Sequence, residues 1–152
     1  MNDQNGYDVE DLRPGMGATF SKTITEADVV MFAGVSGDTN AVHLNEEFAA
    51  TTRFGGRIAH GFLTASVISA AVANRLPGPG TVYLAQQLRF KAPVKPGDTV
   101  HAAVTVVSVD AAKARAVLST VCRVKDTVVI EGEATVMISS RVKRAEQAAL
   151  PA

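Results

Sequence analysis

Two side chains that can handle a water molecule stand five residues apart in a turn-rich part of the sequence. Asp38 offers a carboxylate and His43 an imidazole, and Gly37 lets the backbone turn sharply just before the carboxylate. A carboxylate and an imidazole within reach of one water molecule can polarise it and move its protons. Asn40, between them, can hydrogen-bond its own loop. This spacing is what acid–base chemistry on water requires.

The same residues also have ordinary structural explanations. An aspartate that follows Ser36-Gly37 is often only a turn residue, and a histidine before Leu44 is often a packed or solvated side chain. A structural hydrogen bond is the better interpretation of His60, and His101 is expected on the surface of a strand. Spacing alone therefore leaves the choice between chemistry and packing open.

Short helices are expected on both sides of this loop. Thr25 followed by Asp28 predicts the start of a helix that Gly34 and Gly37 end. A second short helix is expected from Asn45 to Ala50, with the asparagine as its cap.

A longer helix is expected from Gly61 to Leu76. Small and apolar residues cover nearly its whole circumference, which predicts a buried helix, and Pro77-Gly78-Pro79-Gly80 stops it abruptly.

The rest of the chain has the pattern of strands. A weak alternation predicts a first strand over Ala18 to Ile24, and turn residues separate four further strands after residue 80. These are expected at Thr81 to Lys91, Thr99 to Val109, Lys113 to Arg123 and Thr127 to Ser139. Their short connections predict antiparallel neighbours in a β-meander. We therefore expect an α+β protein of the hot-dog type, an antiparallel sheet wrapped around a central helix. Pairing of sheet edges between two subunits predicts a homodimer.

The composition is that of a single globular domain. The 152 residues are 47% hydrophobic and 20% charged, and 15 basic residues balance 15 acidic ones, so neither nucleic acid nor a membrane surface is an expected partner. No apolar stretch is long enough to span a bilayer, and residues 1–11 do not resemble a secretory signal. The single cysteine, Cys122, fits a packed strand position and a reducing compartment, so we expect a cytoplasmic protein. Its core is expected over about residues 18–138, with 139–152 as a loosely held tail.

The loop that holds Asp38 and His43 resembles the hydratase signature of MaoC-like (R)-specific enoyl-CoA hydratases. That signature runs aromatic, small residues, Ser-Gly-Asp-x-Asn-Pro-aliphatic-His. The chain supplies these types at Phe32, Ser36, Gly37, Asp38, Asn40, Val42 and His43, with Ala49 at the small position six residues later. Ala41 replaces the usual proline, which loosens the φ restriction of the loop but removes no reacting group. The similarity includes Ile58-Ala59-His60-Gly61 and Leu88 to Val94 and covers about residues 18–138.

The resemblance implies reversible addition of water to trans-2-enoyl-CoA, giving (R)-3-hydroxyacyl-CoA without a cofactor or a metal ion. Asp38 and His43 would hold the water, with the acid and base roles unassigned, and the N–H of Gly61 at the start of the long helix would meet the thioester oxygen. Asn40 and Ser66 would adjoin the substrate. In the setting of this family the product feeds polyhydroxyalkanoate synthesis from fatty acid oxidation.

Two other functions remain open. A hot-dog thioesterase would need a carboxylate on the long helix, and Gly61 to Leu76 contains neither Asp nor Glu. A non-catalytic acyl-binding domain would tolerate the loss of Asp38 or His43, and both are present. Close packing explains Gly61 equally simply, and a helix–sheet contact explains Ser66. The sequence does not specify the acyl chain length or the choice between coenzyme A and a carrier protein.

Overall fold

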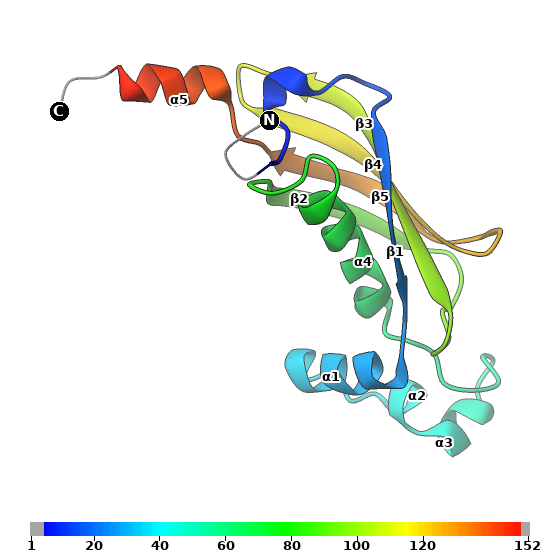
Figure 1. Cartoon of the computed structure of the whole chain (residues 1–152). Helices are drawn as coiled ribbons and strands as arrows, with labels where there is room; N and C mark the ends of the chain where they lie inside the picture. Colours follow the sequence, from blue (N-terminus) through cyan, green and yellow to red (C-terminus); the bar gives the residue numbers. More distant parts are fainter. Residues whose placement is uncertain (1–4, 150–152) are drawn as a thin grey trace.

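A five-stranded antiparallel sheet forms one layer of the structure, and a long helix lies across one of its faces (Figure 1). The computed structural model describes residues 5–149. Along the sheet the strands follow the order β1-β3-β4-β5-β2. They are β1 (Gly17–Thr23), β2 (Val82–Phe90), β3 (Thr99–Asp110), β4 (Arg115–Val124) and β5 (Thr127–Met137). The predicted hot-dog arrangement and all five predicted strands are confirmed.

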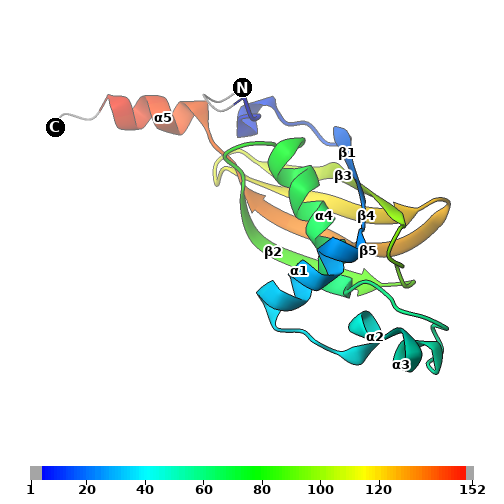
Figure 2. The same cartoon turned by 60° about the horizontal axis from the view of Figure 1, so that its bottom comes forward.

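Within residues 5–149, one helix lies on a face of the sheet, three lie at one end of it, and two lie at the other end (Figures 1 and 2). They are the 3₁₀ helix η1 (Val9–Asp11) and the α-helices α1 (Glu26–Ser36), α2 (Ala41–Leu44), α3 (Glu46–Ala50), α4 (Gly61–Asn74) and α5 (Arg141–Ala148). None of the helices in the described part of the chain has the length and apolar character needed to cross a membrane.

The predicted meander is only partly right. β3, β4 and β5 are consecutive antiparallel neighbours, but β2 pairs with β5 at the far edge, so β2 and β3 are not neighbours. The segment 91–98 between them is long enough to cross the end of the sheet, and Lys91 donates from its backbone to Val129 O while Ile24 donates to Asp98 O. Two prolines in this segment, Pro93 and Pro96, lack the amide hydrogen that direct pairing of β2 with β3 would use, so the expected antiparallel pairing of these two strands does not form.

The core lies between α4 and the sheet. The buried face of α4 repeats every three or four residues, as expected for a helix that rests on one surface. Its members are Leu63, Thr64, Val67, Ile68, Ala71 and Val72. Apolar side chains from β3, β4 and β5 meet this face, including Val104, Leu118 and Ala134. Cys122 is buried on β4 as a free thiol, as predicted, and burial raises its pKa to about 12.

The opposite face of α4 is open to solvent, which the sequence analysis did not expect. Phe62 is 69% exposed, and Ser66 and Ser69 follow it on the same exposed stripe. Small and apolar residues all around this helix predicted burial on every side. A single protomer covers only one side.

The helices on either side of the loop that carries Asp38 and His43 are capped as predicted. Thr25 and Asp28 form a capping box at the start of α1, and Asn45 Oδ1 accepts the hydrogen bond of the Phe48 amide in α3. Gly34 was predicted to end the first helix, but it lies inside α1, and Gly37 alone ends it with a φ of 77°. This left-handed conformation favours glycine and turns the chain directly into Asp38.

η1 and the start of α5 lie on the side of the molecule away from α1–α3, and α5 extends outward from there (Figure 1). Residues expected as a tail form α5, and its first turn approaches η1 through ion pairs of Arg141 and Arg144 with Asp8. Val9 and Leu12, in a segment that reads as polar, are buried in the core. Residues 150–152 of the expected tail lie outside the described residues.

Candidate active site

The loop between α1 and α2 is held by hydrogen bonds from its own side chains. Ser36 Oγ donates to Phe32 O at 2.6 Å and accepts from the Asp38 amide at 3.1 Å. Asp38 Oδ1 accepts from the Asn40 amide at 3.2 Å. One carboxylate oxygen of Asp38 is therefore engaged in an Asx turn, which orients the other oxygen, Oδ2, away from the loop.

His43 is oriented by its backbone and by one ring nitrogen. Asn40 Oδ1 accepts from the Val42 amide and caps α2, whose last turn carries the histidine. Nδ1 of His43 lies 2.8 Å from the carbonyl oxygen of Ile58. A carbonyl oxygen can only accept, so Nδ1 carries the hydrogen, and in the neutral ring Nε2 holds a lone pair.

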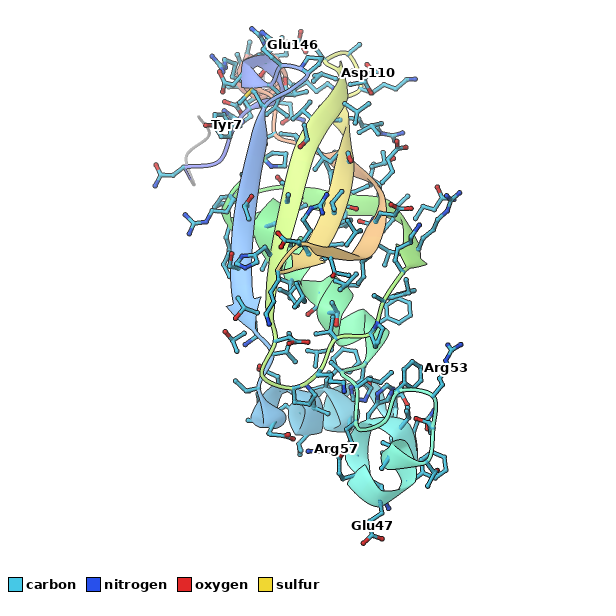
Figure 3. All side chains as sticks on the ribbon, turned by 90° about the vertical axis from the view of Figure 1, so that its right-hand side faces the viewer. Tyr7, Glu47, Arg53, Arg57, Asp110 and Glu146 are labelled. Carbon is cyan, nitrogen blue, oxygen red and sulfur yellow. The ribbon has the colours of Figure 1, made fainter. Side chains whose placement is uncertain are left out.

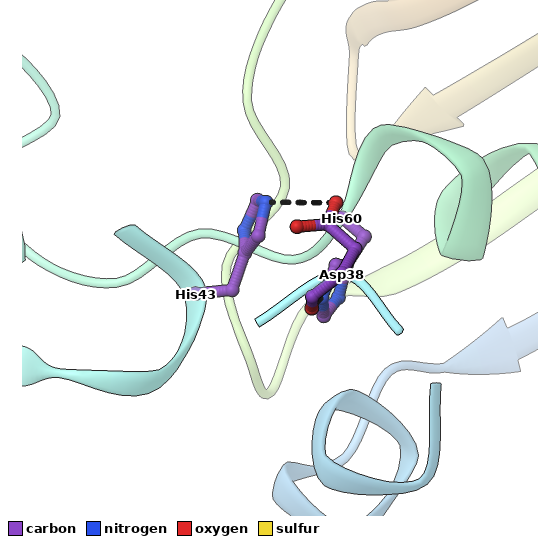
Figure 4. A group of neighbouring side chains, drawn as sticks. All are labelled: Asp38, His43 and His60. Carbon is purple, nitrogen blue, oxygen red and sulfur yellow. Dashed lines mark hydrogen bonds and ion pairs between the residues drawn. The ribbon is translucent and has the colours of Figure 1, made fainter. Parts of the chain in front are cut away.

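The two candidate catalytic side chains face one another across a short gap. His43 Nε2 and Asp38 Oδ2 are 3.9 Å apart (Figure 4). A water hydrogen-bonded to both atoms at about 2.8 Å would span this gap with an angle of roughly 90°, not far from that between its own O–H bonds. The imidazole is 10% exposed and the carboxylate 49% exposed, so a small molecule can reach the gap from the aspartate side. This arrangement can hold one water molecule between two hydrogen-bond acceptors.

A second histidine completes the cluster. His60 is 1% exposed, and its Nε2 lies 3.0 Å from the backbone oxygen of Asp38, so the structural hydrogen bond expected for it is present. Its ring packs on His43, with ring centres 4.0 Å apart, and on Phe32 at 4.9 Å. Phe32, the aromatic residue of the signature, thus contacts His60 and is linked through it to His43.

A cavity of about 230 Å³ opens beside this cluster. Its wall combines His43 and Gly61 with apolar residues from β2, β5 and the 91–98 segment. Phe90, Val94 and Ile130 are among these apolar residues, and Thr64 of α4 adds a polar group. A mostly apolar cavity with a few polar groups is the usual form of a small-molecule site.

Gly61 begins α4 at the wall of this cavity, next to the N-cap His60. The first amides of a helix have no partner inside the helix, and the helix dipole makes this end favourable for negative charge. Close packing is present as well, because a Cβ at this position would lie 2.8 Å from Phe90 Cε1. The structure is thus consistent with both interpretations of Gly61, as a helix-start amide that faces the cavity and as a site of close packing.

The two residues expected to adjoin the substrate lie in different places. Asn40 is within the loop, and its side-chain oxygen is engaged in capping α2. Ser66 is on the exposed face of α4, donates to Leu63 O at 2.6 Å, and is not among the described residues that line the cavity. Asp38, His43 and Gly61 come together at one site, and the roles of Asn40 and Ser66 stay predictions.

The sequence analysis expected no metal site, yet three potential ligands come together. Asp38, His43 and His60 each offer an atom within 4.8 Å of the others. However, the two imidazole rings pack on each other, with centres 4.0 Å apart and planes tilted by 31°. Ring nitrogens bind a metal through lone pairs in the plane of the ring, and two rings that pack on each other at this tilt do not direct these lone pairs at one point, as a zinc site requires. The cluster therefore suits stacking better than coordination.

Basic residues lie near the cavity. Arg53 and Lys91 are among its lining residues, and Figure 3 shows Arg53 and Arg57 at the end of the molecule formed by α1–α3. Arg57 joins α1 to α3 through Glu26 at 2.7 Å and Glu46 at 3.1 Å. These bonds fix the helices on either side of the active loop. The sequence analysis did not consider Arg53, because an isolated arginine in a loop carries no distinctive pattern.

Comparisons with known proteins place this chain among hydratases and dehydratases of one family. An (R)-specific enoyl-CoA hydratase of Rhodospirillum rubrum is 53% identical over 132 residues, which is 87% of this chain and 92% of that protein. A 3-hydroxybutyryl-CoA dehydratase of Methylorubrum extorquens is 48% identical over 87% of this chain and 84% of its own length. The solved structure of the R-hydratase PhaJ1 from Pseudomonas aeruginosa matches with a TM-score of 0.84 and 42% identity, covering 90% of this chain and 88% of that one. Residues 12–136 match the family described as MaoC like domain, and the chain belongs to that family.

Proposed function

We propose that this protein is an (R)-specific enoyl-CoA hydratase, a hydro-lyase that adds water reversibly to trans-2-enoyl-CoA. The observation that carries the proposal is the 3.9 Å gap between Asp38 Oδ2 and His43 Nε2 at the edge of the cavity. The names of the Rhodospirillum rubrum and Methylorubrum extorquens relatives support the reaction class and the acyl-CoA substrate.

The reaction needs a hydroxyl group at C3 and a proton at C2. The water held between Asp38 and His43 gives up one proton to one of these groups as its oxygen bonds to C3. The C2=C3 π electrons move toward the thioester, and C2 then receives a proton from the same pair. Water is thus added across the double bond, and no redox step is involved.

Negative charge develops on the thioester oxygen during the attack. The N–H of Gly61 stabilises this charge, because the amide stands at the N-terminus of α4 in the same cavity wall as His43. A donor of this kind contributes about 3–4 kcal/mol to a reaction of acyl groups.

The direct test uses crotonyl-CoA. The wild-type chain should remove the absorbance of the enoyl thioester, and an (R)-specific dehydrogenase should oxidise the product. Asp38→Asn and His43→Gln should each lower kcat by about 10²- to 10⁴-fold, since each removes a group that handles the proton. Circular dichroism checks that the variants fold.

The outcomes separate the candidate functions. Near-normal rates in either folded variant would contradict the mechanism. Release of free thiol without loss of the double bond would identify a thioesterase. If neither change occurs with crotonyl-CoA, longer or carrier-bound enoyl groups are tried before an acyl-binding domain is accepted.

A homodimer is part of this proposal. Three exposed apolar side chains, Val82 (48%), Leu84 (43%) and Phe90 (50%), lie on β2 at the free edge of the sheet. The exposed Phe62 on α4 packs edge-on against Phe90, with ring centres 5.8 Å apart. The other edge, β1, exposes mainly polar residues. Pairing of β2 with β2 of a second copy would extend the sheet and cover these apolar groups.

The proposed location is the cytoplasm. Cys122, the single cysteine, is a buried free thiol, which fits a reducing compartment. Acyl-CoA thioesters are also intracellular metabolites, so both the proposed substrate and the free thiol are consistent with the cytoplasm.

A further inference from the structure

We propose that His60 is a positioning residue that holds Asp38 and His43 in the geometry needed to grip the water molecule. This inference rests on the proposed hydratase function. His60 is 1% exposed and lies between the active loop and the start of α4. It contacts the backbone of Asp38 through Nε2 and the ring of His43 through its own ring face.

The hydrogen bond of His60 fixes the tautomer of its ring. Nε2 lies 3.0 Å from the Asp38 carbonyl oxygen, which can only accept, so Nε2 carries the hydrogen. In the neutral ring Nδ1 then holds a lone pair, and it is buried without a hydrogen-bond partner in the described part of the chain. An unpaired buried polar atom costs about 1–3 kcal/mol.

Packing alone does not account for this residue. A phenylalanine would fill the same space between Phe32 and His43 and would remove the unpaired Nδ1, but it would also take the hydrogen-bond donor away from the Asp38 carbonyl oxygen. What the imidazole adds to packing is therefore the Nε2–H bond to the loop that carries Asp38. This bond ties the backbone of that loop to the start of α4.

The bond acts where the aspartate has little other support. The carboxylate of Asp38 is 49% exposed, and among the described residues its Oδ1 is held by one bond inside the loop, from the Asn40 amide at 3.2 Å. The link from the Asp38 carbonyl to His60 ties the loop to α4, the helix that presents the Gly61 amide. One residue therefore sets the distance between the water-holding pair and the oxyanion donor.

The ring of His60 restricts His43. The hydrogen bond from Nδ1 to the Ile58 carbonyl fixes one point of the His43 ring, and the ring of His60, packed on it at a tilt of 31°, limits its rotation. Together they direct Nε2 toward Asp38. In addition, His60 occupies the N-cap position of α4 without a side-chain capping bond in the described residues, so the first amides of the helix remain available to substrate.

Two variants distinguish the effect of the His60 hydrogen-bond donor from the effect of its ring packing. His60→Phe keeps a ring and removes the donor, whereas His60→Gln keeps an amide N–H at the reach of Nε2. His60→Phe should lower kcat by about 10- to 100-fold, because small displacements of reacting groups cost rates of this order. His60→Gln should retain a clearly higher kcat than His60→Phe. KM for crotonyl-CoA should change less than threefold in both.

Two further variants, His60→Asn and Thr120→Val, serve as controls. If His60→Phe does not fold, His60→Gln is compared with His60→Asn, whose amide is too short to reach the Asp38 carbonyl and should be the slower enzyme. Thr120→Val removes a different buried polar contact, the bond to Gln86 at 3.1 Å, and should leave kcat unchanged. A kcat within twofold of wild type in folded His60→Phe, or equal losses in the Gln and Phe variants, would overturn the proposal.

Amide hydrogen exchange gives a readout that does not need turnover. The peptide that contains residues 38–43 should exchange faster in His60→Phe than in wild type or in His60→Gln, since the loop loses its tie to α4. If wild-type protein shows no hydratase activity but this loosening is observed, the function fails while the positioning role stands. If the enzyme is active and the loop is equally protected in all variants, the positioning role fails alone.

Discussion

Gly61 shows how tightly the site is built at the level of single residues. Its position at the start of α4 leaves its amide without a partner inside the helix, and Phe90 stands where its Cβ would be. In the proposed mechanism, the same absence of a side chain would serve both the approach of a thioester oxygen and the packing of the cavity wall. Replacing it tests both at once.

Gly61→Ala should lower kcat/KM for crotonyl-CoA by about 10- to 100-fold, because the added methyl group displaces the Phe90 ring at the cavity wall and shifts the amide. Steady-state kinetics on folded protein measure this. Gly34→Ala is the matched control: it is also a helical glycine, but nothing lies within 4 Å of its Cβ. It should keep wild-type kinetics and raise the free energy of unfolding by about 0.5–1 kcal/mol. Unchanged kinetics in Gly61→Ala would remove the glycine from the proposed site.

At the scale of elements, α5 and η1 are joined by a cluster of charges outside the matched family region of residues 12–136. Asp8 is 1% exposed and accepts hydrogen bonds from Arg144 at 2.8 Å and from Ser139 Oγ at 2.9 Å. The hydrogen bond from Arg144 is the main reason that the pKa of the Asp8 carboxyl is lowered. Arg141 likewise lowers the pKa of Asp11 to about 2.

Asp8→Asn should reduce the free energy of unfolding at pH 7 by on the order of 1–3 kcal/mol, the size expected for a hydrogen bond to a charged group. A lowered pKa in the folded state means that the unfolded chain binds more protons. The stabilisation is therefore present above the unfolded value of about 3.9 and is lost as the pH falls through the folded value.

Urea unfolding of wild type and Asp8→Asn at several pH values checks this. The difference between them should shrink as the pH falls below about 4. Asp126→Asn, in an exposed turn, should match wild type throughout. A difference that stays constant with pH would show that the charge of Asp8 is not the source of the stability.

At the scale of the whole molecule, one protomer leaves apolar surface uncovered on the β2 side. If β2 edges pair, Leu84→Arg should weaken the dimer, because it places a charge in the apolar part of a contact that needs roughly 1,000 Å² or more to be stable. Sedimentation equilibrium gives the dissociation constant.

Val107→Arg is the control, since Val107 is 49% exposed but lies on β3, an interior strand. It should remain dimeric. A monomeric wild type, or equal dissociation in both variants, would exclude pairing through β2. Ser66, on the exposed face of α4, would become buried by a partner if this face takes part in the dimer.

Much of the fold was predictable because local signals agreed with it. The Thr25–Asp28 capping box, the left-handed Gly37 and the Asn45 cap are short-range hydrogen-bond and φ preferences, and each appears where the sequence predicted it. Strand alternation likewise located β3 to β5. The position of β2 beside β5 was not predictable from its own pattern, because an edge strand and an interior strand can share the same alternation.

The sequence by itself determined the pair of proposed reacting groups, Asp38 and His43, and the segment that carries them. Asp38 and His43 are close in the chain, so a glycine turn and the Asn40 cap suffice to bring them together. Only the tertiary structure decided what surrounds them. The Ile58 carbonyl that sets the His43 tautomer, the Phe90 ring against Gly61 and the bond from His60 to Asp38 join residues 15 to 29 positions apart. Contacts at such separations depend on how α4 packs on the sheet, and no local pattern encodes them.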